Sequence, residues 1–343
     1  MKYALVAAFI LFTCVSSFAQ QPVAPTDSVK KRPAVRQLAK NRTYRELSEA
    51  MNEPDSVYRL DLGRKSLTEI PAQVLKFPNL EVLTLDNNKI TQIPATIGTL
   101  KNLKQLIMRY NELTIIPAEI GTAKQLQILD LSNNKLTRIP PEIGGLELLE
   151  RFSATDNQIT TIPPEMAKLT KLQQINLESN QISVIPTAIM KMEELIQLDL
   201  TNNQIETISP EIEGLKGLRS LELGNNKLKV IPNEVGNLIR LDKIELKENQ
   251  LQRVPATFGN LLNLRSLDLS GNPLVDLPIP ELAKIPNLRS FMISNAVKAQ
   301  PSRSNPSSNA NTRQVPEFNR DKQPAAPNSK QPPVINREKQ NPR

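Results

Sequence analysis

The chain has 343 residues, no histidine and one cysteine, Cys14. These counts exclude Ser-His-Asp triads, Cys-His catalytic pairs and metal sites built from histidine and cysteine. The formal net charge of +8 is unevenly distributed, because residues 57–295 hold 26 basic and 27 acidic side chains and residues 296–343 hold 9 and 3. Most of the positive charge therefore belongs to the C-terminal segment and none of it to residues 57–295.

Residues 1–19 have the pattern of a secretory signal peptide, with Lys2 as the positive n-region and an apolar stretch over residues 3–15. Small residues precede a cleavage site after Ala19. The apolar stretch is shorter than the ~20 residues of a membrane span. A threonine precedes Cys14 where an acylation site favours a smaller residue. We therefore expect cleavage near Ala19 rather than a lipid anchor at Cys14, and a secreted or periplasmic protein without a transmembrane span.

Residues 20–33 are polar and contain proline, as in a linker. In residues 34–56 the larger apolar side chains fall roughly on one helical stripe. They are Leu38, Tyr44, Leu47 and Met51. A stack of repeats exposes apolar core at its ends, so we predict an N-terminal helical cap here, with a partner-binding helix as the alternative.

A 23-residue pattern, L-x-x-L-x-L-x-x-N-x-L-x-x-I-P-x-x-I-x-x-L, recurs ten times from Val57, and half a repeat follows at Leu288. The alternation around the second and third leucines predicts a short strand. The ninth position is asparagine in nine copies and Lys65 in the first, and we predict that these amides bond the backbone of the following turn as a ladder. The ladder consists of Asn88, Asn111, Asn134, Asn157, Asn180, Asn203, Asn226, Asn249 and Asn272. The Ile-Pro step predicts an extended or short helical return segment.

The Ile-Pro-x-x-Ile-Gly form of the repeat, as in residues 93–98, resembles the 23-residue repeats of bacterial leucine-rich repeat proteins and of the Ras-associated and plant Ras-group-related subclass. This resemblance covers residues 57–295 and implies an α/β-type solenoid of about ten and a half repeats. The implied architecture is an arc with a parallel β-sheet on its concave face that binds another macromolecule. The intracellular relatives bind small GTPases and signalling proteins, but the leader here contradicts that setting, so the partner does not carry over.

Three apolar residues, Val82, Ile107 and Ile128, occupy open-face strand positions where other repeats carry polar residues. The polar and aromatic residues around them are Asp86, Arg109, Tyr110, Asp130 and Arg151. An apolar centre rimmed by tyrosine and arginine is typical of a binding hot spot. The alternative is that these are ordinary strand residues that contact no partner.

A row of carboxylates, Asp199, Glu222, Glu245 and Asp268, is predicted on neighbouring strands about 4.8 Å apart. Such a row could bind Ca²⁺, and its spacing is close to the carboxyl separation of a retaining glycosidase. A solvated acidic face beside Lys243 and Lys247 is the interpretation we favour, because an open sheet does not exclude water. We therefore expect no enzyme activity, metal or cofactor.

Residues 296–343 hold eight prolines, seven asparagines and few large apolar side chains, which predicts a disordered tail. Its basic residues are dispersed and Phe318 is its one aromatic residue, so no specific nucleic-acid site is expected. The sequence thus predicts an exported, monomeric, non-catalytic module that binds a protein on its concave face. The alternatives are an envelope or glycan adhesin that uses the acidic row and the tail and, more remotely, a carboxylate hydrolase.

Overall fold

The structure is a computed structural model that describes residues 40–293. The signal peptide predicted at residues 1–19, the linker at 20–33, the start of the cap at 34–39 and the tail at 296–343 lie outside the described residues. Within residues 40–293, no helix is long and apolar enough to cross a membrane.

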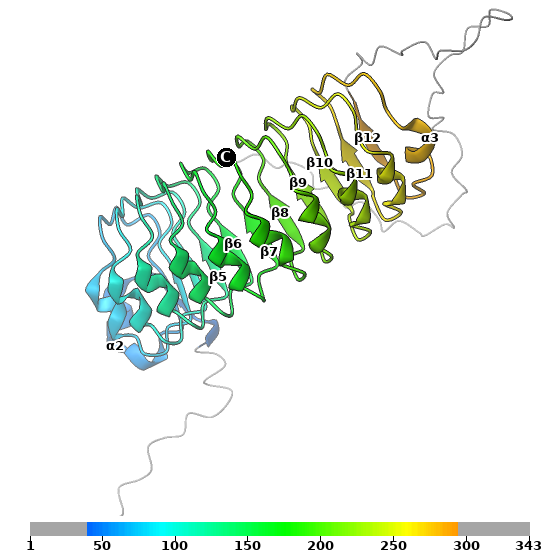
Figure 1. The fold of residues 1–343 in the computed structure, drawn as a ribbon. Helices are drawn as coiled ribbons and strands as arrows, with labels where there is room; N and C mark the ends of the chain where they lie inside the picture. The colour runs from blue at the N-terminus through cyan, green and yellow to red at the C-terminus, as the bar shows by residue number, and fades with distance from the viewer. Residues whose placement is uncertain (1–39, 294–343) are drawn as a thin grey trace, which may run out of the picture. The chain divides into compact units, whose positions relative to one another are not determined.

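Twelve strands pair in chain order to form one parallel sheet, and each repeat contributes one strand (Figure 1). The strands are β1 (Thr43–Tyr44), β2 (Arg59–Asp61), β3 (Val82–Thr84), β4 (Gln105–Ile107), β5 (Ile128–Asp130), β6 (Arg151–Ser153), β7 (Gln174–Asn176), β8 (Gln197–Asp199), β9 (Ser220–Glu222), β10 (Lys243–Glu245), β11 (Ser266–Asp268) and β12 (Ser290–Met292). Strands β2 to β12 correspond to the ten repeats and the half repeat, which confirms the predicted solenoid.

The Ile-Pro step of each repeat leads into a short helical turn on the return side of the stack. These turns are the 3₁₀ helices η2 (Ala72–Lys76), η3 (Ala95–Thr99), η4 (Ala118–Thr122), η5 (Pro141–Gly145), η6 (Pro164–Lys168), η7 (Thr187–Lys191), η8 (Pro210–Gly214), η9 (Asn233–Asn237) and η10 (Ala256–Asn260). The tenth repeat, which has one more residue around its two prolines, carries the α-helix α3 (Ile279–Leu282) instead. The fixed φ of proline fits the N-cap or first position of such a turn.

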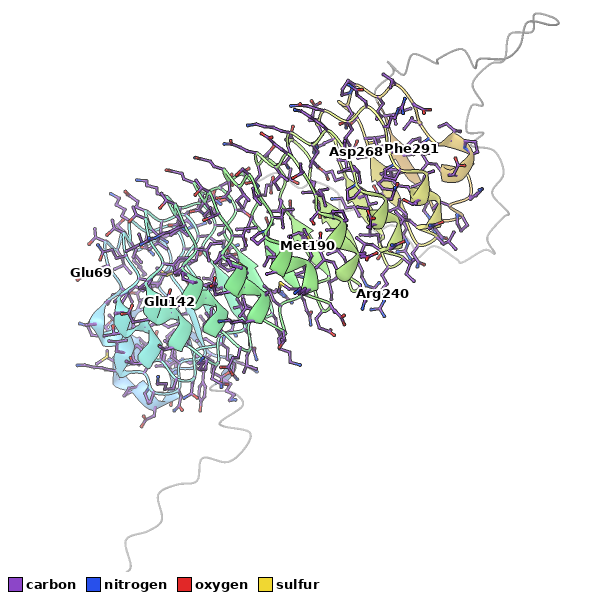
Figure 2. All side chains as sticks on the ribbon, viewed as in Figure 1. Glu69, Glu142, Met190, Arg240, Asp268 and Phe291 are labelled. Carbon is purple, nitrogen blue, oxygen red and sulfur yellow. The ribbon has the colours of Figure 1, made fainter. Side chains whose placement is uncertain are left out.

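The core is one continuous apolar stripe between the sheet and the helical turns, running from Tyr44 to Ile285. The central residue of each repeat strand from β2 to β11 points inward, and Leu106 and Leu129 have no exposed surface. The residues on either side of it in the strand lie on the opposite face, which we call the open face. Figure 2 shows the side chains along this stack from Glu69 to Phe291.

The N-terminal segment differs from the helical cap predicted at residues 34–56. It contains strand β1, helix α2 (Leu47–Asn52) and the 3₁₀ helix η1 (Pro54–Ser56). Leu47 and Met51 pack against the core from α2, as the helical stripe requires, but Tyr44 lies on β1 and pairs with Leu60 of β2. The open edge of β2 offers unpaired backbone groups, and a tyrosine has high strand propensity, so pairing overrides the helical pattern there.

Candidate functional site

The open face is built from columns of side chains in strict register. Ile107, at the end of β4, stands between Thr84 of β3 and Asp130 of β5. Ile128, at the start of β5, stands between Gln105 and Arg151. The 23-residue period therefore places residues of adjacent repeats about 4.8 Å apart across the sheet.

The three predicted apolar residues are not equally accessible. Ile107 and Ile128 are partly exposed, whereas Val82 is only 8% exposed and counts as buried. Val82 stands in register between Arg59 and Gln105, whose long side chains flank it. The exposed apolar centre of the open face therefore consists of Ile107 and Ile128.

Tyr110 projects from the turn after β4 and is 55% exposed. Its φ is 55°, in the left-handed region, and the equivalent turn residue of every repeat also has positive φ. Neighbouring repeats carry asparagine there, at Asn87 and Asn133, and asparagine tolerates this conformation better than tyrosine. The position therefore holds an exposed aromatic ring at a cost in backbone strain.

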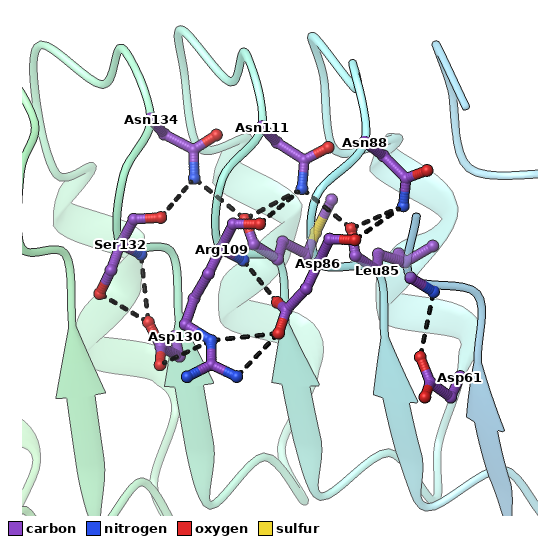
Figure 3. A network of polar contacts seen from close by, with 11 residues as sticks. Asp61, Leu85, Asp86, Asn88, Arg109, Asn111, Asp130, Ser132 and Asn134 are labelled. Carbon is purple, nitrogen blue, oxygen red and sulfur yellow. Dashed lines mark hydrogen bonds and ion pairs between the residues drawn. The ribbon is translucent and has the colours of Figure 1, made fainter. Parts of the chain in front are cut away.

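The asparagine ladder fixes these turns (Figure 3). Asn111 donates from Nδ2 to the carbonyl oxygens of Leu85 at 2.9 Å and Met108 at 3.2 Å. Its Oδ1 accepts from the backbone N–H of Ile90 at 3.0 Å. The nine asparagines are all between 6% and 9% exposed, so their hydrogen bonds replace those with water. The hydrogen bonds of each asparagine therefore fix the turn residue that precedes it, just after the strand ends.

Three charged residues on the open face are committed to one another (Figure 3). Arg109 donates to Asp86 Oδ2 from its terminal nitrogen at 2.7 Å and from Nε at 3.1 Å, and its Nε lies 3.8 Å from Asp130 Oδ2. The hydrogen bond to Asp86 raises the pKa of Arg109 above its ordinary value. Asp130 Oδ1 also accepts hydrogen bonds from the backbone N–H and the hydroxyl of Ser132. These residues form a rigid polar rim beside the apolar centre.

Arg151 lies apart from this cluster. Its side chain is exposed, and among residues 40–293 no carboxylate lies within ion-pair distance of it. It lines a hollow of about 270 Å³ on the open face over β5 to β8. The amides of the hollow are Gln174, Asn176 and Gln197. The sequence alone did not indicate a role for these three residues, although the 23-residue spacing from Ile128 and Asp130 places them in the same two columns.

The acidic row is in register across β8 to β11, and lysines neutralise its centre. Lys243 Nζ lies 2.5 Å from Glu222 Oε2 and 3.1 Å from Glu245 Oε2, and Lys247 lies 2.8 Å from Glu245. Desolvation opposes ionisation of Glu245, but its hydrogen bonds to Lys247 and Lys243 outweigh this and lower its pKa overall. Among the described residues no group of three or more carboxylates is placed to hold a metal ion.

The two outer aspartates of the row each make a hydrogen bond to the backbone of the turn that follows. Asp199 and Asp268 are 7% and 8% exposed, and each accepts a hydrogen bond from the backbone N–H two residues later. Burial raises the pKa of Asp199, and the charges of Glu222 and Glu245 add to this effect. The row therefore combines turn-capping aspartates with lysine-paired glutamates, which is the arrangement of a solvated, internally compensated face.

A second asparagine pattern, at the opposite end of the strands, was not recognised from the sequence. Three of these side chains donate to a carbonyl of the preceding repeat, and Asn79 donates to that of Asp55 just before the first repeat, all at 2.8 or 2.9 Å. They are Asn79, Asn102, Asn263 and Asn287. The signal was available, because all four precede the first leucine of a repeat, but the middle repeats lack it and it does not run through the chain.

The fold and the open face are those of a solenoid repeat protein whose β-sheet exposes polar and apolar side chains. Residues 115–229 match the family model described as a leucine-rich repeat region, and residues 55–113 and 216–274 match the leucine rich repeat model. The chain is a leucine-rich repeat protein, a family whose members are typically non-catalytic binding modules. No curated protein gives a significant match.

Several solved structures are similar to the chain. A leucine-rich repeat protein of Leptospira interrogans is 33% identical with a TM-score of 0.68, and the match covers 74% of this chain and 66% of that one. The plant peptide hormone receptor RGFR1, in complex with RGF2, is 32% identical with a TM-score of 0.60, and the match covers 68% of this chain and 38% of the receptor. The ectodomain of the receptor kinase GASSHO1/SCHENGEN3 from Arabidopsis thaliana, in complex with CASPARIAN STRIP INTEGRITY FACTOR 2, is 27% identical with a TM-score of 0.56, covering 68% and 31%. The chain therefore spans less than half of either receptor chain.

Proposed function

We propose that the protein is an exported module that binds a protein partner on the open face of its sheet, around Ile107, Ile128 and Tyr110. The observation that carries this proposal is the pair of partly exposed isoleucines on adjacent strands beside the 55% exposed ring of Tyr110. Apolar and aromatic side chains that lie together on an exposed surface are typical of a binding hot spot. The peptide complexes of the two plant receptors support the same use of this fold.

In this proposal the polar rim also contacts the partner, through Arg109. Because Asp86 and Asp130 already hold the Arg109 side chain, less conformational entropy is lost when it contacts a partner. The signal-peptide pattern of residues 1–19 supports export of a mature protein that begins near Gln20. The lysine pairing of the acidic row disfavours the adhesin and hydrolase alternatives, since the central carboxylates are occupied.

The test is a crosslinked capture from native envelope and culture medium, with the full chain as bait. The matched bait carries Ile107→Asp and Tyr110→Asn. The introduced residue types already occur at the equivalent positions of adjacent repeats, as Asp130 for the first and as Asn87 and Asn133 for the second. The stack should therefore accommodate them. We expect a partner that the wild-type bait captures and the variant loses by about tenfold or more, as for hot-spot residues.

A control bait carries Val184→Asp, which changes a 66% exposed apolar residue away from the open face. It should capture the same partner as the wild type. Equal capture by the wild-type and double-variant baits, with equal thermal unfolding temperatures, would show that the site lies elsewhere.

A further inference from the structure

The hollow over β5 to β8 has an unusual set of unused hydrogen-bonding groups. The guanidinium of Arg151 has no carboxylate partner among residues 40–293, and the Gln174 amide has no side-chain partner there. Asn176 Oδ1 accepts from Thr155 Oγ1 at 2.9 Å and from the Glu178 N–H at 3.1 Å. These two bonds fix which end of the amide is the oxygen, so Nδ2 is a donor without an acceptor among the described residues.

Gln197, the fourth polar side chain of the hollow, makes a hydrogen bond with only one end of its amide. Gln197 Nε2 donates to Glu222 Oε1 at 3.2 Å, which leaves Gln197 Oε1 as an acceptor. Gln174 and Gln197 stand in register on β7 and β8. The two side chains therefore start from backbones about 4.8 Å apart, which is the spacing of neighbouring strands in a sheet.

The hollow is lined by one cation, Arg151, and one carboxylate, Asp130. Asp130 already accepts two hydrogen bonds from Ser132 and lies 3.8 Å from Arg109. Arg151 is therefore a cation with no ion-pair partner within residues 40–293, and a guanidinium binds carboxylates with strong, directional hydrogen bonds.

The size of the hollow decides the class of ligand. At about 270 Å³ and open to solvent, it is below the range of roughly 300–1,000 Å³ in which drug-sized molecules are buried. It suits one or two side chains of a larger partner. The partly exposed Ile128 lies at its edge and joins it to the apolar centre, so one extended segment can cross both.

We propose that this hollow is a carboxylate subsite, in which Arg151 and Asn176 bind a carboxylate of an extended polypeptide while Gln174 and Gln197 bind its main chain. The inference rests on the proposed function and specifies the partner chemistry of the same face. The carboxylate belongs either to an internal Asp or Glu side chain or to the C-terminus of the segment.

The experiment uses an array of synthetic 12-residue peptides probed with the full chain at low and at physiological salt. Each sequence is present in three forms: an internal Glu with an amidated C-terminus, Gln in its place with an amidated C-terminus, and the same Gln with a free C-terminal carboxylate. We expect the wild type to bind one carboxylate form about tenfold or more above the uncharged form, the usual advantage of a charge-assisted hydrogen bond. The preferred form identifies the source of the carboxylate.

Two variants make the result specific. Arg151→Gln should lose the preference and still fold, because Gln105, Gln174 and Gln197 occupy the same column. Arg138→Gln, an exposed arginine outside the open-face columns, should keep it. Equal binding of all three forms, a preference that survives Arg151→Gln, or no binding to any peptide would overturn the inference. None of these outcomes touches the proposed function, which is measured separately by capture through Ile107 and Tyr110.

Discussion

At the scale of single residues, the buried asparagines show how one side chain serves two repeats. Asn157 donates from Nδ2 to the carbonyl oxygens of Leu131 and Ala154 at 3.1 and 3.0 Å, and its Oδ1 accepts from the N–H of Leu136 at 2.9 Å. It is 9% exposed, so water does not replace these bonds if they are lost. The stack is therefore sensitive to this residue because several backbone groups depend on it.

Asn157→Leu should lower the free energy of unfolding by about 2–4 kcal/mol, because it leaves buried backbone groups unpaired. Denaturant unfolding followed by circular dichroism measures the change. Gln158→Leu, the same substitution at the adjacent exposed position, is the control and should change stability by less than about 0.5 kcal/mol. Equal effects of the two substitutions would mean that the ladder does not stabilise the stack.

Tyr110 and Val82 show what a sequence period can and cannot specify at this scale. The period placed both in the correct column of the repeat, but it carries no information on how far neighbouring side chains cover a position. Val82 is buried between Arg59 and Gln105, whereas Tyr110 extends from the turn. Likewise, the pairing of Arg109 with Asp86 depends on rotamers rather than on spacing.

At the scale of strands, the acidic row contains two carboxylates, Asp199 and Glu245, whose surroundings shift the pKa in opposite directions. Burial raises the pKa of Asp199, so the folded state binds this proton more tightly than the unfolded state does. Stability then falls as the pH rises between the ordinary and the raised pKa. The lysines that lower the pKa of Glu245 have the reverse effect: its contribution is present above the ordinary pKa and is lost as the pH falls through the folded value.

Asp199→Asn should therefore stabilise the protein at neutral pH, and the gain should vanish in acid once Asp199 is protonated in both states. The amide keeps the turn contact, since Asn176 makes the same bond in the same column. Glu245→Gln should destabilise at neutral pH, with a loss that shrinks in acid. Thermal unfolding temperatures of both variants, measured from neutral to acidic pH, give the two trends. Parallel trends would contradict the assignment of opposite environments.

The elements themselves follow closely from the repeat, with one exception at its edge. Leucine alternation and the Ile-Pro step predicted the strands β2 to β12 and the helical turns, because every repeat confirms the same local pattern. Strand β1 was not predicted, since it lies outside the repeats and forms only because β2 offers an open edge. Local periodicity does not reveal a pairing of this kind between a flanking segment and a sheet.

At the scale of the whole described stack, stability passes from each repeat to its neighbours, and the two ends differ. At the N-terminal end, Tyr44 is 2% exposed on β1, and the guanidinium of Arg42 lies 4.3 Å from the centre of its ring. At the other end, Phe291 of β12 is only partly buried and Met292 is 45% exposed. The first strand is thus packed like core, whereas the last described strand retains exposed apolar surface.

Tyr44→Ala should remove about 3–5 kcal/mol of packing from the N-terminal end. Because repeats contact only their neighbours, amide hydrogen exchange should accelerate in β2 and β3 and stay unchanged in β9 and β10. Tyr44→Phe, which keeps the ring and loses only the 3.4 Å hydroxyl contact to Glu53, should resemble the wild type. Phe291→Ala should cost less, since this ring is already partly in water, and its effect should be confined to β11 and β12. Uniform acceleration through all strands after Tyr44→Ala would instead show that the stack unfolds as one cooperative unit, whose ends have no independent stability.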